Sequence, residues 1–231
     1  MRDQFAGDST DWIKFSLLRT LAKNDRVIGI AWYYVGHVEA VAGEHLDEDV
    51  WLELRQMREK RSVRAIEELP IWPKQTRFFR KPVPPQEYRK VWLEEMKECL
   101  DGSTLTFLDP DNGIGNADNL HATMDEIRGI RASGRVVVLI HFPHRGGAYD
   151  EQVAEQHKRI QTATKAESIF TIRIRVTVQR EISHGPKRIF SKPLWFTVID
   201  ADEAIRKRAD EFVVRLKKAG CEALIEPKEQ K

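Results

Sequence analysis

Three apolar runs separated by a helical pattern limit most strongly what this chain can fold into. Val27–Val35, Thr104–Leu108 and Arg135–His141 are rich in β-branched and aromatic residues, which is typical of strands buried on both faces. Between the first two runs, apolar residues recur at helical spacing over Gln86–Leu100. Because parallel strands need a crossover connection, usually a helix, the alternation predicts a three-layer α/β fold with a mostly parallel sheet.

The C-terminal third of the chain predicts a change in strand direction. Ile169–Val178 and Leu194–Ile199 both have the pattern of strands, and no helical segment separates them. The intervening Ile182–Pro193 reads as a turn region. We therefore expect one antiparallel strand near the C-terminus, followed by a helix over Asp202–Ala219 and a last short strand over Cys221–Ile225.

Composition is that of a soluble globular chain, and we expect one α/β domain over residues 1–231 with a helical insertion at about 46–85. The net charge of +2 arises from 38 basic and 36 acidic side chains, so a basic surface requires local segregation of charge. Two scattered cysteines without metal-ligand spacing, and no signal-like segment after Met1, predict a cytoplasmic protein. No window approaches the ~18 uncharged residues of a membrane span, so no membrane partner is expected.

The clearest candidate site follows the second apolar run. Asp109-Pro110-Asp111-Asn112-Gly113 ends this strand, because Pro110 removes a ladder donor and Asn112 and Gly113 tolerate positive φ. In open α/β sheets, ligands bind at the carboxyl ends of the strands. Asp109 and Asp111 offer oxygens for a divalent cation, and Asn112 offers both a donor and an acceptor.

Polar residues at the start of the first helix form a second candidate group. Asp8 or Ser9 is the expected N-cap, Asp11 lies in the first turn, and Lys14 follows one turn later. Asp8 and Asp11 are candidate substrate-binding residues. A helix N-terminus with a nearby lysine can hold an anion, so Lys14 is a candidate phosphate ligand.

The third candidate group follows the next strand. His141 ends the Arg135–His141 run, and His144 and Arg145 follow it in the next loop. Because neighbouring parallel strands end at the same edge of a sheet, these residues are expected near Asp109, with Arg145 as a phosphate ligand. The aromatic residues Trp32, Tyr33 and Tyr34, by contrast, are predicted to be core packing.

The motifs of residues 3–150 resemble those of a family of bacterial and phage proteins without an assigned activity. More distantly, the chain is similar to the large-subunit ribosomal RNA adenine methyltransferases and to the three-Cys-motif partner proteins. The resemblance to the bacterial and phage family rests on Gly7/Asp8/Asp11/Lys14, Leu17-Leu18-Arg19, Trp32-Tyr33, Arg61-Ser62-Val63, Phe107 to Gly113, and His141-Phe142-Pro143-His144-Arg145. The more distant resemblance rests on Phe5-Ala6-Gly7, Asp11, Lys14 and Leu108-Asp109-Pro110-Asp111.

The more distant resemblance implies a Rossmann-like, methyltransferase-like fold that acts on nucleic acid or nucleotides. Asp109 stands where those enzymes carry an Asp-Pro-Pro-Tyr motif that holds the amino group of the target base. The implied cofactor is S-adenosylmethionine, yet the first strand runs into bulky Trp32, Tyr33 and Tyr34 where the family has a glycine-rich loop. We therefore expect a site that has degenerated in cofactor binding, with Asp109, Asn112, His141 and Lys14 as its central residues.

Two alternatives remain open at this point. Asp109 and Asp111 as metal ligands, joined by Asp8 or Asp11, suit a Mg²⁺- or Mn²⁺-dependent nuclease or phosphodiesterase. His141 or His144 would be its acid or base. A degenerate transferase fold also suits a non-enzymatic partner subunit of a defence or modification system, with the charged Asp47–Leu69 segment as its protein-binding surface.

Overall fold

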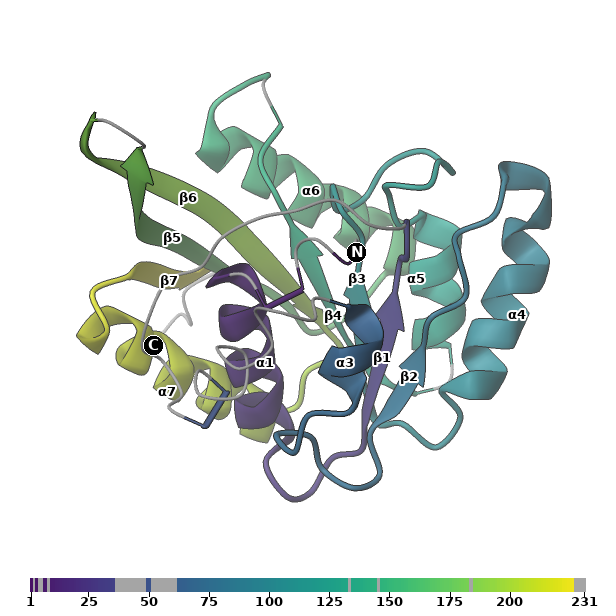
Figure 1. Cartoon of the computed structure of the whole chain (residues 1–231). Helices are drawn as coiled ribbons and strands as arrows, with labels where there is room; N and C mark the ends of the chain where they lie inside the picture. Colours follow the sequence, from purple (N-terminus) through teal and green to yellow (C-terminus); the bar gives the residue numbers. More distant parts are fainter. Residues whose placement is uncertain are drawn as a thin grey trace.

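A seven-stranded mixed sheet forms the centre of this computed structural model, in the order β2-β1-β3-β4-β6-β5-β7 (Figure 1). The structure describes residues 1, 3, 6–7, 9–35, 49–50, 62–132, 134–144, 146–182 and 185–226. Strands β1 to β4 pair in parallel, whereas β6 is antiparallel to both of its neighbours and β7 is antiparallel to β5. The strands are β1 Ile28–Trp32, β2 Arg77–Phe79, β3 Leu105–Asp109, β4 Val136–His141, β5 Ile169–Ile182, β6 Gly185–Ile199 and β7 Glu222–Glu226.

Helices cover both faces of the sheet, and a separate hydrophobic core lies under each helical layer (Figure 1). One core joins α1, α3 and α7 to the sheet through residues such as Leu18, Ile66 and Phe212. The other joins α4, α5 and α6 through residues such as Met96 and Ile130. The helices are α1 Ser9–Ala22, α3 Val63–Glu67, the 3-10 turn η3 Gln86–Tyr88, α4 Arg89–Cys99, α5 Met124–Arg131, α6 Tyr149–Thr164 and α7 Glu203–Lys218.

The three apolar runs of the sequence are strands β1, β3 and β4, and every residue of these strands is buried. The prediction of an α/β fold with parallel strands is thus confirmed. Two strands, β6 and β7, run against the others, where the sequence predicted one. The predicted turn region Ile182–Pro193 is wrong, because all of it except residues 183–184 is described as part of the β5–β6 hairpin.

Residues 46–48 and 51–61 of the predicted helical insertion at 46–85 lie outside the described residues. The described part includes α3, which Ser62 caps by accepting a hydrogen bond from the Ala65 amide at 3.0 Å. It also includes β2, which pairs with β1 and forms one edge of the sheet. Among the described residues, no helix is both long and apolar enough to cross a membrane.

Candidate functional site

The strand order places a switch in chain direction between β1 and β3. From β1 the chain moves outward to β2 and then returns to the other side of β1 as β3. Trp32 and Asp109, the last residues of β1 and β3, are register partners at this switch. Ligand crevices of open α/β sheets lie outside the carboxyl ends of strands at such a switch, so this edge is the first place to look for a site.

Asp109 lies in a buried ion cluster with Lys14 and Asp11. The Lys14 Nζ atom lies 2.8 Å and 3.1 Å from the two carboxylate oxygens of Asp109, and 3.1 Å from Oδ1 of Asp11. The other Asp11 oxygen accepts a hydrogen bond from the Gly7 amide at 2.8 Å. All three charged side chains are at most 5% exposed. Because Lys14 engages two carboxylates inside the protein, its positive charge neutralises Asp109 rather than facing a phosphate.

The Met1 ammonium group adds a second positive charge at the same edge. It donates hydrogen bonds to the carbonyl oxygens of Tyr33 and, at 3.4 Å, Asp109, and it lies 2.9 Å from Oδ1 of Asp111. Burial lowers the pKa of this ammonium, whereas the nearby Asp109 and Asp111 carboxylates oppose that shift. The Met1 carbonyl in turn accepts a hydrogen bond from the Val35 amide at 3.0 Å. Met1 therefore fills the space between the ends of β1 and β3.

The loop after β3 is held in a fixed turn that exposes Asn112. The Asn112 amide donates to the Leu120 carbonyl at 3.0 Å, and the Ala122 amide donates to the Gly113 carbonyl at 2.8 Å. These two hydrogen bonds join the beginning and the end of the loop formed by residues 112–122. The Asn112 side chain is exposed to solvent. Of the two central residues of the turn predicted to meet a substrate, Asp109 is thus buried and Asn112 is accessible.

Gly113 is required at its position for two reasons. Its φ is +84°, a conformation that L side chains rarely adopt. A Cβ atom placed there would also lie only 2.7 Å from Nδ1 of His141. Gly113 lets the loop pass directly over the buried imidazole.

Replacing Gly113 with alanine should lower the free energy of unfolding by about 2–4 kcal/mol, since strain at positive φ adds to overpacking against His141. Urea denaturation at neutral pH measures the change. Gly134→Ala is the matched control, because Gly134 also has positive φ but a Cβ atom added there would meet no other atom within 4 Å. An equal loss for both variants would show that His141 does not constrain the loop.

His141 itself is packed, not presented to a ligand. Its ring stacks on Trp195, with the ring centroids 5.1 Å apart, and its Nε2 lies 3.4 Å from the Thr197 hydroxyl. Complete burial lowers the pKa of His141 to about 3, so the imidazole is neutral at neutral pH. The predicted role of His141 as an acid or base in contact with substrate is not supported by this geometry, because the side chain is 1% exposed.

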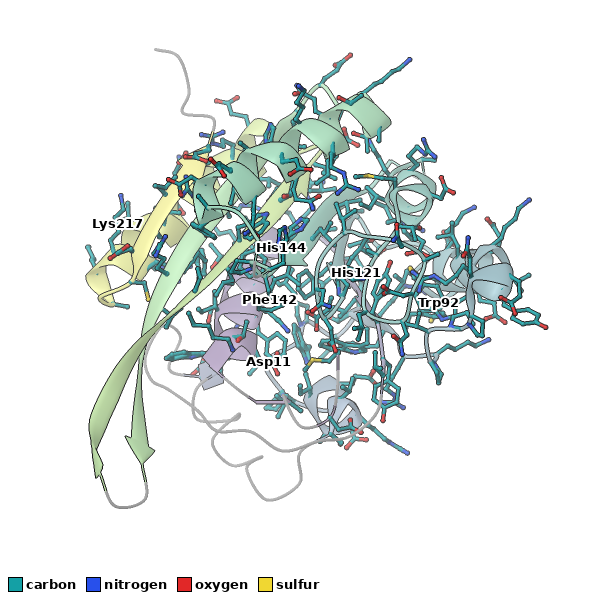
Figure 2. The ribbon with its side chains drawn as sticks, turned by 90° about the horizontal axis from the view of Figure 1, so that it is seen from above. Asp11, Trp92, His121, Phe142, His144 and Lys217 are labelled. Carbon is teal, nitrogen blue, oxygen red and sulfur yellow. The ribbon has the colours of Figure 1, made fainter. Side chains whose placement is uncertain are left out.

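Of the remaining predicted residues, the structure describes His144, which lies in the loop after β4. His144 is exposed, and its Nδ1 accepts a hydrogen bond from the Gly146 amide at 3.1 Å. Figure 2 views the molecule from above and labels Asp11, Phe142, His144 and His121 in its central part, with Trp92 and Lys217 toward the outside. Asp8 and Arg145 lie outside the described residues.

A buried network that the sequence analysis missed fixes the far end of the same loop. Arg89 donates to both Glu126 carboxylate oxygens at 2.6 Å and 2.7 Å, and to the carbonyl oxygens of Asp118 and His121 at 3.0 Å and 2.9 Å. The Tyr33 hydroxyl donates to Glu126 at 2.8 Å. Only the Thr123-x-x-Glu126 capping box was readable in the sequence, and it is present at the start of α5. The network ties β1, α4 and α5 to the loop that carries Asn112.

The acidic side chains that the structure describes at this edge do not assemble a metal site. In the part of the chain that the structure describes, no group of three or more His, Cys, Asp or Glu side chains is arranged to hold a metal ion. Asp109 directs both oxygens to Lys14, and Asp111 contacts the Met1 ammonium. Asp109 and Asp111, the pair predicted as metal ligands, therefore face ammonium groups.

Comparisons with known proteins add little to this geometry. No family model matches the chain, and no curated protein matches it. The fold is similar in part to the crystal structure of precorrin 8W decarboxylase from Methanobacterium thermoautotrophicum, with a TM-score of 0.40 and 12% sequence identity over 81% of this chain and 89% of the other. A TM-score this low assigns neither fold family nor activity to this chain.

Proposed function

We propose that this chain is a Rossmann-like, methyltransferase-like protein that binds nucleic acid or nucleotides at the carboxyl edge of its sheet, with a degenerate cofactor site. One observation carries the proposal. The Asp109-Pro110-Asp111-Asn112 turn lies at the carboxyl ends of the neighbouring strands β1 and β3, with Asp109 buried and ion-paired and Asn112 exposed. A short polar turn held rigidly at this place is suited to hydrogen bonding with a base or sugar edge.

The arrangement of strands supports the methyltransferase-like interpretation. Asp109 ends a central parallel strand, as the Asp-Pro-Pro-Tyr motif of the resembled enzymes would require. The antiparallel β5–β6 hairpin lies after β4 in the chain, which suits the closing hairpin expected from the same resemblance.

The residues at the switch point do not fit S-adenosylmethionine. Such a cofactor needs the backbone at the end of the first strand to approach it closely, which glycine permits. Here Trp32 and Tyr33 are fully buried at that end, and Met1 makes hydrogen bonds to Tyr33 and Asp109. Because these residues occupy the end of the first strand, where the resemblance implies the cofactor, the proposed function is binding and contains no methyl-transfer step.

The residues of the turn then divide their roles. Lys14 neutralises Asp109, so the strand end stays folded against α1 without an uncompensated charge. Asn112 presents a carbonyl oxygen and an amide donor at the surface. Asn112 is therefore the residue we expect to contact the ligand, and Asp109 and Lys14 position it.

The test is fluorescence anisotropy with a fluorescein-labelled single-stranded DNA oligonucleotide of mixed sequence. Asn112→Ala should weaken binding about 3- to 10-fold, the loss expected for one or two net hydrogen bonds. Asn119→Ala is the matched control, since Asn119 is also an exposed asparagine of this loop. Equal affinities of the Asn112→Ala variant and the parent protein would refute the proposal, as would no binding by either.

Calorimetry tests the cofactor part separately. We expect no heat when S-adenosylmethionine is added at millimolar concentration. A measurable binding isotherm would show that the cofactor site is intact.

A further inference from the structure

Strands β5 and β6 continue well beyond the rest of the sheet as a two-stranded arm, which we define as residues 176–182 and 185–192. The last β4 residue paired with β6 is His141, and the first β7 residue paired with β5 is Glu222. Beyond these points, Val176–Ile182 pairs only with Gly185–Lys192 among the described residues. Seven strand residues extend ~23 Å at ~3.3 Å each. Both views show this ribbon projecting from the body of the molecule (Figures 1 and 2).

The arm leaves the sheet at the same edge as the candidate site. Strand β5 runs in the same direction as β3. Strand β3 pairs in parallel with β4, and β5 is antiparallel to β6, which is itself antiparallel to β4. At the base of the arm, the Lys192 ammonium donates a hydrogen bond to the Thr10 hydroxyl in the first turn of α1. Thr10 directly precedes Asp11 of the buried ion cluster. The base of the arm is therefore anchored beside the candidate site.

The arm has a local excess of positive charge. Residues 177–192 include four basic residues and one acidic residue, a net charge of +3, so the other residues together have a net charge of −1. This is the local segregation of charge that a binding surface for a polyanion requires in a chain of almost neutral composition. The basic residues are Arg180, Lys187, Arg188 and Lys192.

Strand pairing with a second copy explains the arm less well. Open strand edges can add a strand from another molecule, and charged residues guard against this addition. Strand β6 also contains Pro186 and Pro193, which have no amide hydrogen to donate to a further strand. The composition of the arm thus opposes pairing along β6 and favours contact with a negatively charged partner.

We propose that the β5–β6 arm is a docking arm for double-stranded DNA. A two-stranded β-ribbon fits the major groove of B-form DNA, which is ~12 Å wide, whereas the major groove of A-form RNA is too deep and narrow for side chains to read. The proposal rests on the proposed function in one respect, because it names duplex DNA as the nucleic acid that this edge receives. The arm lies in the major groove of the DNA. The Asn112 loop faces the DNA strand that the arm brings to the candidate site.

The experiment compares two variants that each remove two positive charges. Lys187→Ala/Arg188→Ala alters the arm, and Lys217→Ala/Lys218→Ala alters the exposed end of α7 outside the candidate site. The probe is a fluorescein-labelled 24-base-pair DNA duplex, titrated at several salt concentrations. The arm variant should bind at least about fivefold more weakly at low salt, and its log–log salt slope should fall by about 2, near 0.9 for each lost phosphate contact. The α7 variant should bind like the parent protein.

Each other outcome overturns a distinct statement. Equal DNA affinities of the arm and α7 variants would show that the arm is not a DNA-binding element. A changed molecular mass of the arm variant in light scattering, with unchanged DNA affinity, would show instead that the arm mediates self-association. Equal arm-dependent binding of an RNA duplex would overturn the choice of DNA. The arm variant could lose duplex binding while Asn112→Ala leaves the affinity for single-stranded DNA unchanged. This result would support the arm as a DNA-binding element and refute the proposed function of the Asn112 loop. Lys187→Glu/Arg188→Glu, with its fold checked by circular dichroism, should give a larger loss than the alanine variant.

Discussion

Replacing Lys14 with methionine should lower the free energy of unfolding by about 3–5 kcal/mol, the range measured when one partner of a buried ion pair is removed. Methionine preserves most of the length of the side chain but leaves Asp109 and Asp11 buried without the cation that lies about 3 Å from each. An isolated buried carboxylate is strongly disfavoured, so the protein should lose stability or take up a proton. Urea denaturation at pH 7 measures the loss.

The double variant Lys14→Met/Asp109→Asn provides the control. Removing the Asp109 charge as well should recover part of the stability, because one fewer buried carboxylate then loses the Lys14 cation. The exposed ion pair Arg64–Glu68 is the comparison, because exposed ion pairs contribute little to stability. Arg64→Met should change the free energy of unfolding by less than about 1 kcal/mol. A loss for Lys14→Met as small as that for Arg64→Met would show that Asp109 is not held by Lys14.

Lowering the pH from 7 to 5 should reduce the free energy of unfolding by about 2 kcal/mol through His141 alone. The pKa of His141 is lowered from 6.5 to about 3 by burial. Between these two values the unfolded chain binds a proton at this residue and the folded chain does not. The free energy of unfolding therefore rises with pH across this window, and its contribution from His141 is complete above about pH 6.5.

His141→Phe removes the titrating group and preserves an aromatic ring against Trp195. Its stability should depend less on pH between 5 and 7 than that of the parent protein, as measured by urea denaturation at each pH. The variant His144→Phe changes an exposed histidine and should retain the pH dependence of the parent protein. If both variants keep that dependence, His141 is protonated in the folded protein at pH 5.

The parts of the fold that the sequence predicts well are those determined by local patterns. The buried strands β1, β3 and β4 are continuous apolar runs, and α1 follows a clear helical periodicity. The β5–β6 arm was missed because Gly185, Pro186 and Pro193 are typical of turns when read locally. In the structure, pairing between the two strands overrides this local preference.

The location of the candidate site was predictable, but its internal contacts were not. The carboxyl ends of strands meet at one edge by topology, so the proximity of Asp109 to His141 follows from the strand order. The ion pair between Lys14 and Asp109 joins residues 95 positions apart, and no local pattern encodes it. Arg89 likewise reads as one of many charged residues of an amphipathic helix, although it is 6% exposed and bridges two further elements.

The Arg89–Glu126–Tyr33 network has a consequence for the thermodynamics of recognition. It orders the Asn112 loop in the free protein, so the conformational entropy of that loop is lost during folding and not on binding. A ligand that contacts Asn112 should therefore meet a preorganised surface, and loosening the loop at Arg89 should weaken binding through entropy while the contacts themselves remain. On the proposed function, we expect affinity at this edge to depend on Arg89 of α4, on the far side of the loop, as well as on the residues that touch the ligand.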